Sequence, residues 1–252
     1  MDTMQALRIE LEGDVTSFRY PHFMWGMQPT FEMPPPATIY GHVCSAVGEW
    51  IIPDDLLFAY RFTHDGKFMD LEHIHASGMA APISPQKRKE LVAQGLSDVT
   101  VYGESTVTPF QRELLFRPRL TLYLNQVELL PAFERPHYVV VLGRSQDLCT
   151  YPPGAVQVVT LEKRANVYFE HTLLPLSMGA HTRRGVAVMM PRLIDFQQHR
   201  HPTFAQYLML TERVFAHDMQ TVGSFEPVWC DPLAPQYRGC YRAVVWHRFI
   251  EG

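Results

Sequence analysis

The residue types in this sequence that are best suited to chemistry are clustered cations. The clusters lie in PQKRKEL, FQRELLFRPRL, LEKRANV and the glycine-flanked GAHTRRGV. Their members are Lys87, Arg88, Lys89, Arg112, Arg117, Arg119, Lys163, Arg164, Arg183 and Arg184. Lysine and arginine neutralise phosphates, and glycine lets a backbone approach a nucleic-acid strand closely. Each cluster alone is typical of a solvated surface, but the four together favour binding of RNA or single-stranded DNA.

Histidine pairs and a turn serine are the next candidates, and none of them completes a catalytic or metal motif. His73 and His75, like His199 and His201, have a His-x-His spacing that can chelate a metal, but no third ligand accompanies either pair. The four cysteines form no CxxC pair. Ser145 in LGRSQD lies at a predicted turn, yet the sequence contains no GxSxG, Walker A or GxGxxG motif. We therefore expect no catalytic residue, no metal and no cofactor.

The composition is that of a globular protein with an uneven charge distribution. The chain has 252 residues, of which 46% are hydrophobic, enough for one large domain or two small ones. The net charge is −4, but residues 1–75 carry −7 and residues 76–200 carry +4. This asymmetry is compatible with a basic strip for a polyanion or simply with solvated faces. Without an apolar run of about 18 residues or a signal-peptide h-region, we expect a cytoplasmic protein with reduced cysteines and no membrane partner.

The elements that must position these cations follow from hydrophobic periodicity. MQALRIELEG alternates apolar and polar residues and predicts a half-buried strand. Helical spacing over Thr38–Trp50 predicts a helix with Thr38 as N-cap. The next segment, LLFAYRFTHDGKFMDLEHIHA, predicts two strands paired as a hairpin through Asp65-Gly66. Residues 77–111 lack core-forming runs and predict a long excursion, partly hairpin and partly helix, of a length that usually serves a function.

The remaining elements complete an α+β prediction. LLFRPRLTLYL predicts a strand, ELLPAFERP a short helix or turn, and HYVVVLGRSQDL a buried strand that ends in a Gly-Arg-Ser turn. Their succession predicts an RRM/ferredoxin-like domain over residues 1–150. Residues 151–252 predict a smaller β-rich C-terminal portion, in which HPTFAQYLMLTERVFAHD is compatible with either helix or strand.

A proline-rich loop precedes the first predicted helix. Pro34 to Pro36 hold the chain extended and set the φ angle at the helix start. Free N–H groups at that start favour a nearby anion, so an RNA phosphate and a solvent-facing helix end are both compatible with it. The loop aromatics Phe23, Trp25 and Phe31 are suited to base stacking and equally to packing.

Three stretches together resemble the Cas five family of CRISPR-associated proteins, the RAMP-superfamily subunit of type I Cascade complexes. Pro35, Pro36, Thr38 and Gly41 in TFEMPPPATIYGHVCSAVGEW match the family's Pro-Pro-x-Thr helix start and the glycine that follows. PFQRELLFRPRLTLYL is similar to the strand after the family's thumb, and Leu142 to Ser145 match its Leu-Gly-Arg-Ser segment. The versions in type I-B systems are the most similar.

The resemblance implies an RRM-like domain with a protruding β-hairpin thumb at about residues 77–111. It implies a non-catalytic subunit that binds and caps the 5′ handle of the CRISPR RNA. The implied partners are the Cascade backbone subunit, the large subunit and target DNA near its PAM-proximal end. The expected RNA-binding residues are Lys87, Arg88, Lys89, Arg112, Arg144, Ser145, Thr38, Tyr40, Arg183 and Arg184.

Two enzymatic alternatives remain. One branch of the family, in type I-C systems, cleaves precursor RNA without metal through tyrosine, lysine and histidine. Tyr40, His42 and Lys87 have the side chains for such a metal-independent endoribonuclease, although no adjacent Lys-His pair occurs here. A metal-dependent hydrolase built on the His-x-His pairs is the other alternative.

Overall fold

The computed structural model describes residues 2–22, 26–76, 83–96, 106–219 and 226–250. Contacts divide the chain into two compact units. The first comprises Met1–Phe18, Thr30–Phe68 and Leu114–Gly252, and the second comprises Arg19–Pro29 and Met69–Glu113. Residues from both sides of position 150 therefore belong to the first unit. The predicted division into 1–150 and 151–252 stays a prediction.

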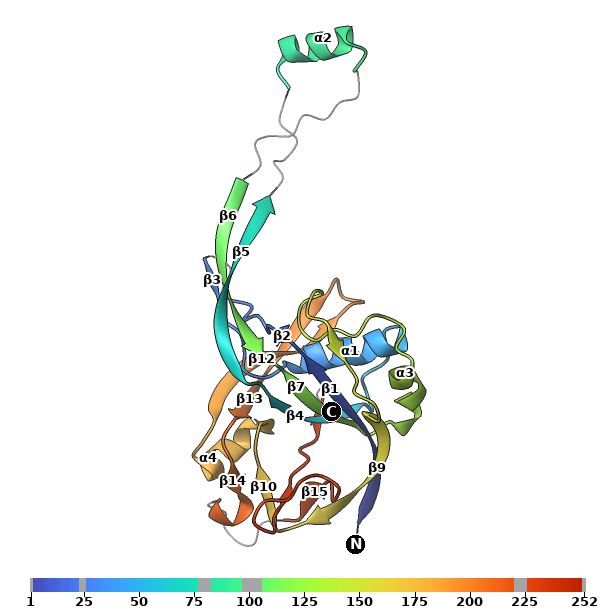
Figure 1. The fold of residues 1–252 in the computed structure, drawn as a ribbon, viewed down its shortest axis with the longest axis vertical. Helices are drawn as coiled ribbons and strands as arrows, with labels where there is room; N and C mark the ends of the chain where they lie inside the picture. Colours follow the sequence, from blue (N-terminus) through green and yellow to red (C-terminus); the bar gives the residue numbers. More distant parts are fainter. Residues whose placement is uncertain (1, 23–25, 77–82, 97–105, 220–225, 251–252) are drawn as a thin grey trace. The chain divides into compact units, whose positions relative to one another are not determined.

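A seven-stranded sheet forms the centre of the first unit (Figure 1). Its order is β15-β9-β1-β7-β4-β17, with β8 paired to β1. These strands are β1 (Thr3–Gly13), β4 (Leu57–Thr63), β7 (Arg119–Leu124), β8 (Cys149–Thr150), β9 (Val156–Arg164), β15 (Val228–Cys230) and β17 (His247–Arg248). The predicted alternation in β1 is confirmed, because Leu7, Ile9 and Leu11 are buried on one face.

Four of these strands and two helices make a ferredoxin-like unit. The chain runs β1, α1 (Pro36–Val47), β4, β7, α3 (Leu130–Glu134) and β9. The four strands lie in the order β9-β1-β7-β4, and every neighbouring pair is antiparallel. The helices α1 and α3 contact each other (Figure 1). This βαββαβ succession confirms the predicted α+β fold class.

The first helix starts and ends earlier than predicted. Pro36 is its first residue and Pro35 its N-cap, so Thr38 lies inside the first turn, and the prediction of Thr38 as N-cap was wrong. Proline presets the helical φ and has no N–H to satisfy, which makes it suitable as first helical residue. The helix stops at Gly48, whose φ of 94° is left-handed and whose N–H bonds the Cys44 carbonyl at 2.8 Å.

The predicted hairpin at Asp65-Gly66 is also wrong. The flanking strands exist, but β4 pairs with β7 and β17, whereas β5 (Gly66–Ala76) pairs with β6 (Thr106–Phe116). The chain bends at Asp65, whose N–H bonds the Phe116 carbonyl at 2.8 Å. Its carboxylate receives two hydrogen bonds from Arg119, at 2.8 and 3.1 Å. These long-range contacts hold the Asp-Gly dipeptide in a bend between two sheets.

The predicted buried strand in HYVVVLGRSQDL forms only one isolated bridge, between Val141 and Leu148. The N–H groups of His137 and Tyr138 instead bond the carbonyls of Ala46 and Ser45, at the end of α1. This leaves Val139 70% exposed. The segment therefore caps the helix and is not part of the sheet.

The C-terminal portion is rich in strands, as predicted. It holds two three-stranded sheets, ordered β14-β10-β16 and β11-β13-β12. The strands are β10 (Val167–Phe169), β11 (Thr172–Pro175), β12 (Val186–Asp195), β13 (His201–Leu210), β14 (Val214–Phe215) and β16 (Tyr241–Arg242). The ambiguous stretch from His201 is thus a strand. A short helix, α4 (Gly179–Thr182), precedes β12. A hydrophobic core of this portion includes the buried side chains of Val167, Phe169, Leu174 and Leu210.

The second unit contains most of β5 and β6, with β3 (Met27–Gln28) parallel to β6 and a helix, α2 (Pro85–Ala93). The short β2 (Val15–Thr16) pairs with the end of β6 that belongs to the first unit. Residues 77–82 and 97–105 of the predicted thumb, and the loop aromatics Phe23 and Trp25, lie outside the described residues. None of the described helices is long and apolar enough to cross a membrane.

Candidate nucleic-acid interface

The Leu-Gly-Arg-Ser turn is built around a glycine that no other residue replaces without strain. Gly143 has a φ of 99°, in the left-handed region. A Cβ there would lie 2.5 Å from Thr16 Oγ1 and 2.8 Å from the Ser17 carbonyl oxygen. The Thr16 hydroxyl donates a hydrogen bond to the Leu142 carbonyl. The turn is therefore held directly against the end of β2.

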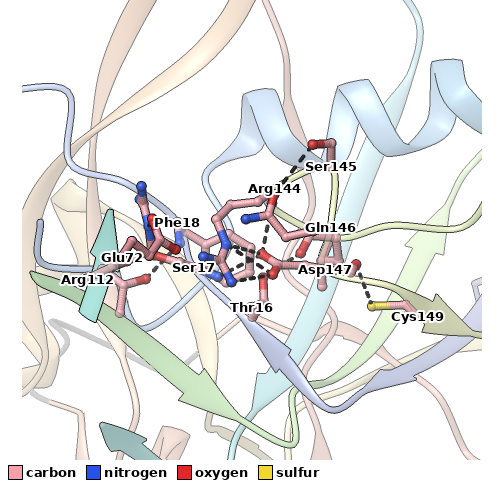
Figure 2. Close-up of polar contacts among 12 residues, drawn as sticks. Thr16, Ser17, Phe18, Glu72, Arg112, Arg144, Ser145, Gln146, Asp147 and Cys149 are labelled. Atoms are coloured by element: carbon pink, nitrogen blue, oxygen red, sulfur yellow. Dashed lines mark hydrogen bonds and ion pairs between the residues drawn. The ribbon is translucent and has the colours of Figure 1, made fainter. Parts of the chain in front are cut away.

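Arg144 in this turn is tied to Asp147, as Figure 2 shows. Its Nη2 lies 2.7 Å from Asp147 Oδ1, and its Nε lies 3.0 and 3.1 Å from the two carboxylate oxygens. The N–H groups of Arg144 and Ser17 also donate to Asp147 Oδ2, at 2.9 and 3.2 Å. The Asp147 side chain is fully buried and that of Arg144 is 16% exposed. Arg144 thus orders the turn, and its predicted RNA contact stays a prediction.

Ser145 is the more accessible residue of this turn. Its side chain is exposed, and its hydroxyl lies 3.5 Å from Gln146 Oε1. A hydroxyl in that position suits a hydrogen bond to ribose or phosphate. The sequence did not identify Asp147, although its spacing of three residues from Arg144 was a signal for an ion pair.

Arg112, expected on the thumb, lies in β6 of the second unit. Its Nε donates to Glu72 Oε2 at 2.8 Å, and its Nη1 donates to Gln28 Oε1. Its guanidinium carbon lies 5.1 Å from the Phe110 ring centre. With 15% of its side chain exposed, Arg112 links β3, β5 and β6. A cation that is already compensated in this way is a weak phosphate ligand.

The cations of α2 have a different environment. The Ser84 hydroxyl caps the helix by accepting the Lys87 N–H at 3.3 Å, and Pro85 is the first helical residue. Lys87, Arg88 and Lys89 are all exposed, and the helix has no buried residue. Three cations therefore stand in the first turns of a helix that buries no face.

At the start of α1, Thr38 is partly exposed and Tyr40 is buried, and the prediction that they contact RNA stays a prediction. Tyr40 is 4% exposed, and its hydroxyl donates to the Ile51 carbonyl. Burial raises the pKa of this phenol well above its usual range. The Thr38 N–H is satisfied by the Pro35 carbonyl at 2.8 Å. Phe31, considered for stacking, is fully buried and belongs to the core.

His42, named for the ribonuclease alternative, is also in the interior. Its ring nitrogens bond the Val141 carbonyl at 3.1 Å and the Tyr151 hydroxyl at 2.9 Å. Burial lowers the pKa of His42 to about 4. The ring is therefore neutral at physiological pH and joins α1 to the segment before the Leu-Gly-Arg-Ser turn.

Arg183 and Arg184 lie on the surface after α4. Arg183 ends that helix with a φ of 50°, and both residues are exposed. Arg184 Nη1 lies 2.6 Å from Glu212 Oε2, with 58% and 63% of the two side chains exposed. An ion pair this exposed is weak. A phosphate can compete for Arg184, so this pair of arginines keeps its predicted accessibility.

The other predicted cations have acidic partners. Arg119 binds Asp65, Lys163 binds Asp2 at 2.9 Å, and Arg164 binds Glu162. Over the described ranges, no group of three or more His, Cys, Asp or Glu residues is arranged to hold a metal. His75 falls among the side chains that the structure leaves undescribed.

Comparison with solved structures finds chains of similar fold. A chain of a structure described as a "CRISPR RNA-guided surveillance complex" is 15% identical with a TM-score of 0.51, covering 84% of this chain and 92% of that chain. A CRISPR protein from Archaeoglobus fulgidus is 11% identical with a TM-score of 0.42, covering 83% and 87%. A chain of a Type III-B Cmr-beta structure is 8% identical with a TM-score of 0.44, covering 83% and 86%. The sequence matches no protein-family model and no curated protein.

Proposed function

We propose that this chain is a non-catalytic CRISPR RNA-binding subunit of a type I Cascade complex, of the Cas five family and the type I-B kind. It binds and caps the 5′ handle of the CRISPR RNA. It bridges the backbone and large subunits and lies close to target DNA at the PAM-proximal end. The fold shared with a chain of a CRISPR RNA-guided surveillance complex supports this assignment.

The observation that carries the proposal is that α2 has exposed cations in its first turns and no buried side chain. A helix of nine residues without a buried side chain is marginal in water, because most helix stability comes from packing of one face. Cations in its first turn also oppose the helix dipole, and no acidic residue stands there. The helix α2 is therefore less stable in the free chain, and binding of a polyanion to Lys87, Arg88 and Lys89 stabilises it. RNA, bound together with a neighbouring subunit, supplies both the charge and the packing surface.

The burial of Tyr40 and His42 supports a non-catalytic role. Proton abstraction from a ribose hydroxyl requires a base within hydrogen-bond reach of the substrate. The Tyr40 hydroxyl is bonded to a backbone carbonyl, and His42 is enclosed with both ring nitrogens occupied. The ribonuclease alternative would have to recruit other groups.

The direct test is co-expression of the chain with the other Cascade subunits and a CRISPR array. We expect the charge reversal Lys87→Glu/Arg88→Glu/Lys89→Glu to reduce complex yield and nuclease protection of the 5′ handle at least tenfold. The matched control reverses three exposed arginines elsewhere, Arg135→Glu/Arg200→Glu/Arg248→Glu, and should retain both. Equal yield and protection for the α2 variant would refute the assignment of α2.

The ribonuclease alternative has its own experiment. Purified protein in excess is incubated with a repeat hairpin RNA in EDTA. We expect the RNA to stay intact. A product ending in a 2′,3′-cyclic phosphate, lost in a His42→Ala variant, would establish catalysis instead.

A further inference from the structure

Arginines from distant parts of the chain meet on one face of the central sheet. This face carries Ala6, Ala59 and Tyr123, and it packs against Val244 near the C-terminus. Arg8 and Arg61 lie two residues beyond Ala6 and Ala59 on β1 and β4. Because side chains alternate along a strand, both arginines lie on the same face.

Two further arginines come from the β14-β10-β16 sheet. Arg242 is opposite Tyr168 in the register of β16 and β10. The guanidinium of Arg213 lies 5.0 Å from the Tyr168 ring centre, and its Nη2 lies 2.7 Å from Glu170 Oε1. This sheet is tied to β4 next to Arg61, because the Phe62 N–H bonds the His171 carbonyl at 2.9 Å. We call Arg61, Arg213 and Arg242 the arginine cluster.

The positive charge of the arginine cluster is incompletely compensated. Burial lowers the pKa of Arg61, and the neighbouring charges of Arg242 and Arg213 lower it further, against the opposing effect of Glu170. Among the described residues, the carboxylate that acts on Arg61 is that of Glu170, and it is already paired with Arg213. The same positive charges act on His171. Burial lowers the pKa of His171, and the nearby Arg61 and Arg213 lower it further, although Glu170 acts in the opposite direction.

The arginines of this region also have buried Nε groups without a hydrogen-bond acceptor among the described residues. The Nε groups of Arg61 and Arg213 are buried and donate no hydrogen bond to any residue in the described ranges. The same holds for Nε of Arg8, whose Nη1 binds the buried Asp231 at 2.9 Å and whose Nε lies 3.6 Å from the half-exposed Glu10. Buried polar groups in native proteins are nearly always paired, and like charges held together cost free energy. An external anion at the terminal nitrogens would offset that cost.

An aromatic row lies beside the arginine cluster. Arg213 and Arg238 lie over the Tyr237 ring, 3.7 and 5.5 Å from its centre. Tyr237 stacks with Phe215 at 6.1 Å and 30°, and Phe215 stacks with His217 at 5.2 Å and 28°. The His217 side chain, at the end of the row, is 68% exposed and lies 3.5 Å from Asp218 Oδ1. A flat ring at the end of such a row is a platform on which an unpaired base stacks.

We infer that the arginine cluster and the aromatic row form a binding site for single-stranded RNA. Phosphodiester groups contact Arg61 and Arg242, and a base stacks on His217. The inference rests on the proposed function, which it deepens by adding an RNA contact that involves neither α2 nor the Leu-Gly-Arg-Ser turn. The alternation of cations with stacked rings favours RNA over an acidic peptide, which would need no exposed aromatic platform.

The test is fluorescence anisotropy of the full chain with a labelled single-stranded RNA, over a series of salt concentrations. We expect Arg61→Gln/Arg242→Gln to weaken binding at least tenfold. The slope of log affinity against log salt should fall by about 1.4, since each phosphate contact on a single strand contributes about 0.7. His217→Ala should weaken binding about fivefold or more at an unchanged slope. Arg135→Gln and Tyr138→Leu are the matched controls and should bind as the unaltered chain does.

Thermal melting in the absence of RNA separates a binding role from a structural one. Removing two crowded cations should raise the melting temperature, whereas loss of a structural ion pair would lower it. The variant Arg61→Lys/Arg242→Lys keeps both charges and replaces the glutamine variant in this test if the latter does not fold. Its slope of log affinity against log salt should equal that of the unaltered chain. An affinity and slope of Arg61→Gln/Arg242→Gln equal to those of the unaltered chain would overturn the inference. Binding of poly-glutamate but not of RNA by the unaltered chain would overturn the inference as well. Failure of the unaltered chain to bind any RNA would also overturn the inference, whereas the co-expression experiment with the α2 variant tests the proposed function separately.

Discussion

The guanidinium of Arg144 is bound to the carboxylate of Asp147, with the closest nitrogen and oxygen 2.7 Å apart and the aspartate fully buried. The two residues are three positions apart in the chain, and the aspartate also accepts backbone N–H groups from Ser17 and Arg144. The Leu-Gly-Arg-Ser turn is thus a folded unit in which the arginine neutralises an interior charge. Its exposed polar side chain is that of Ser145.

Replacing Asp147 by alanine should strongly destabilise the protein. The substitution removes the carboxylate bound to Arg144, whose side chain is 16% exposed, and it removes the oxygen that accepts two backbone N–H groups. Breaking a buried pair in this way costs about 3–5 kcal/mol of the free energy of unfolding. Urea denaturation measures the loss, with exposed Glu134→Ala as control. A loss below about 1 kcal/mol would show that the pair is not structural.

Gly143→Ala should destabilise more than Gly154→Ala. Both glycines have left-handed φ angles, of 99° and 75°, so each alanine carries a backbone cost of about 1–3 kcal/mol. The Cβ at residue 143 additionally meets Thr16 and Ser17, whereas the Cβ at residue 154 meets nothing within 4 Å. Thermal melting of the two variants isolates the steric difference. Equal melting temperatures would mean that the turn moves away from β2 without cost.

Stability should fall as the pH drops from about 6.5 to about 4. Burial lowers the pKa values of His42 and His247 from 6.5 to about 4, so the unfolded chain takes up two protons in this range that the folded chain does not. Their contribution is therefore complete above pH 6.5 and is lost on acidification, by up to about 3 kcal/mol for each histidine.

Denaturant midpoints measured between pH 7.5 and pH 4.5 test this dependence. A His42→Gln variant removes one of the two groups and should have a shallower pH dependence than the unaltered chain. A flat profile for the unaltered chain in this window would contradict the burial of both rings.

Arg112→Ala should loosen the second unit locally. The side chain joins Glu72 on β5 to Gln28 on β3, so its loss removes two charge-assisted bonds. We expect hydrogen exchange at the Gln111 amide, which bonds the Gly26 carbonyl at 2.8 Å, to accelerate about tenfold. In a double-mutant cycle, Arg112 and Glu72 should couple by about 1–2 kcal/mol. Additive effects of Arg112→Ala and Glu72→Ala would remove the proposed link.

Much of the fold could be predicted because it follows from short-range patterns. The alternation of Leu7, Ile9 and Leu11 predicted β1, and the proline-flanked apolar spacing predicted α1 with an error of a few residues. Pairing was less predictable. Asp65-Gly66 has the local chemistry of a hairpin, but the contacts of Asp65 with Arg119 and Phe116 turn it into a bend. Tyr138 and Val139 likewise have the sequence pattern of a buried strand. In the structure, the Tyr138 N–H bonds the Ser45 carbonyl of α1 instead of a neighbouring strand.

Local sequence patterns were enough to predict the α+β class, most strand and helix segments and the supply of cations, because these depend on residue type and on neighbours a few positions away. Which cations are compensated could be seen only in the folded chain. Arg144 and Arg112 acquire carboxylates, whereas the cations of α2 remain exposed and the arginine cluster has too few acids. Compensation depends on distance through space. Arg61, Arg213 and Arg242 come together in the folded chain, where the Phe62 N–H on β4 bonds the His171 carbonyl just after β10.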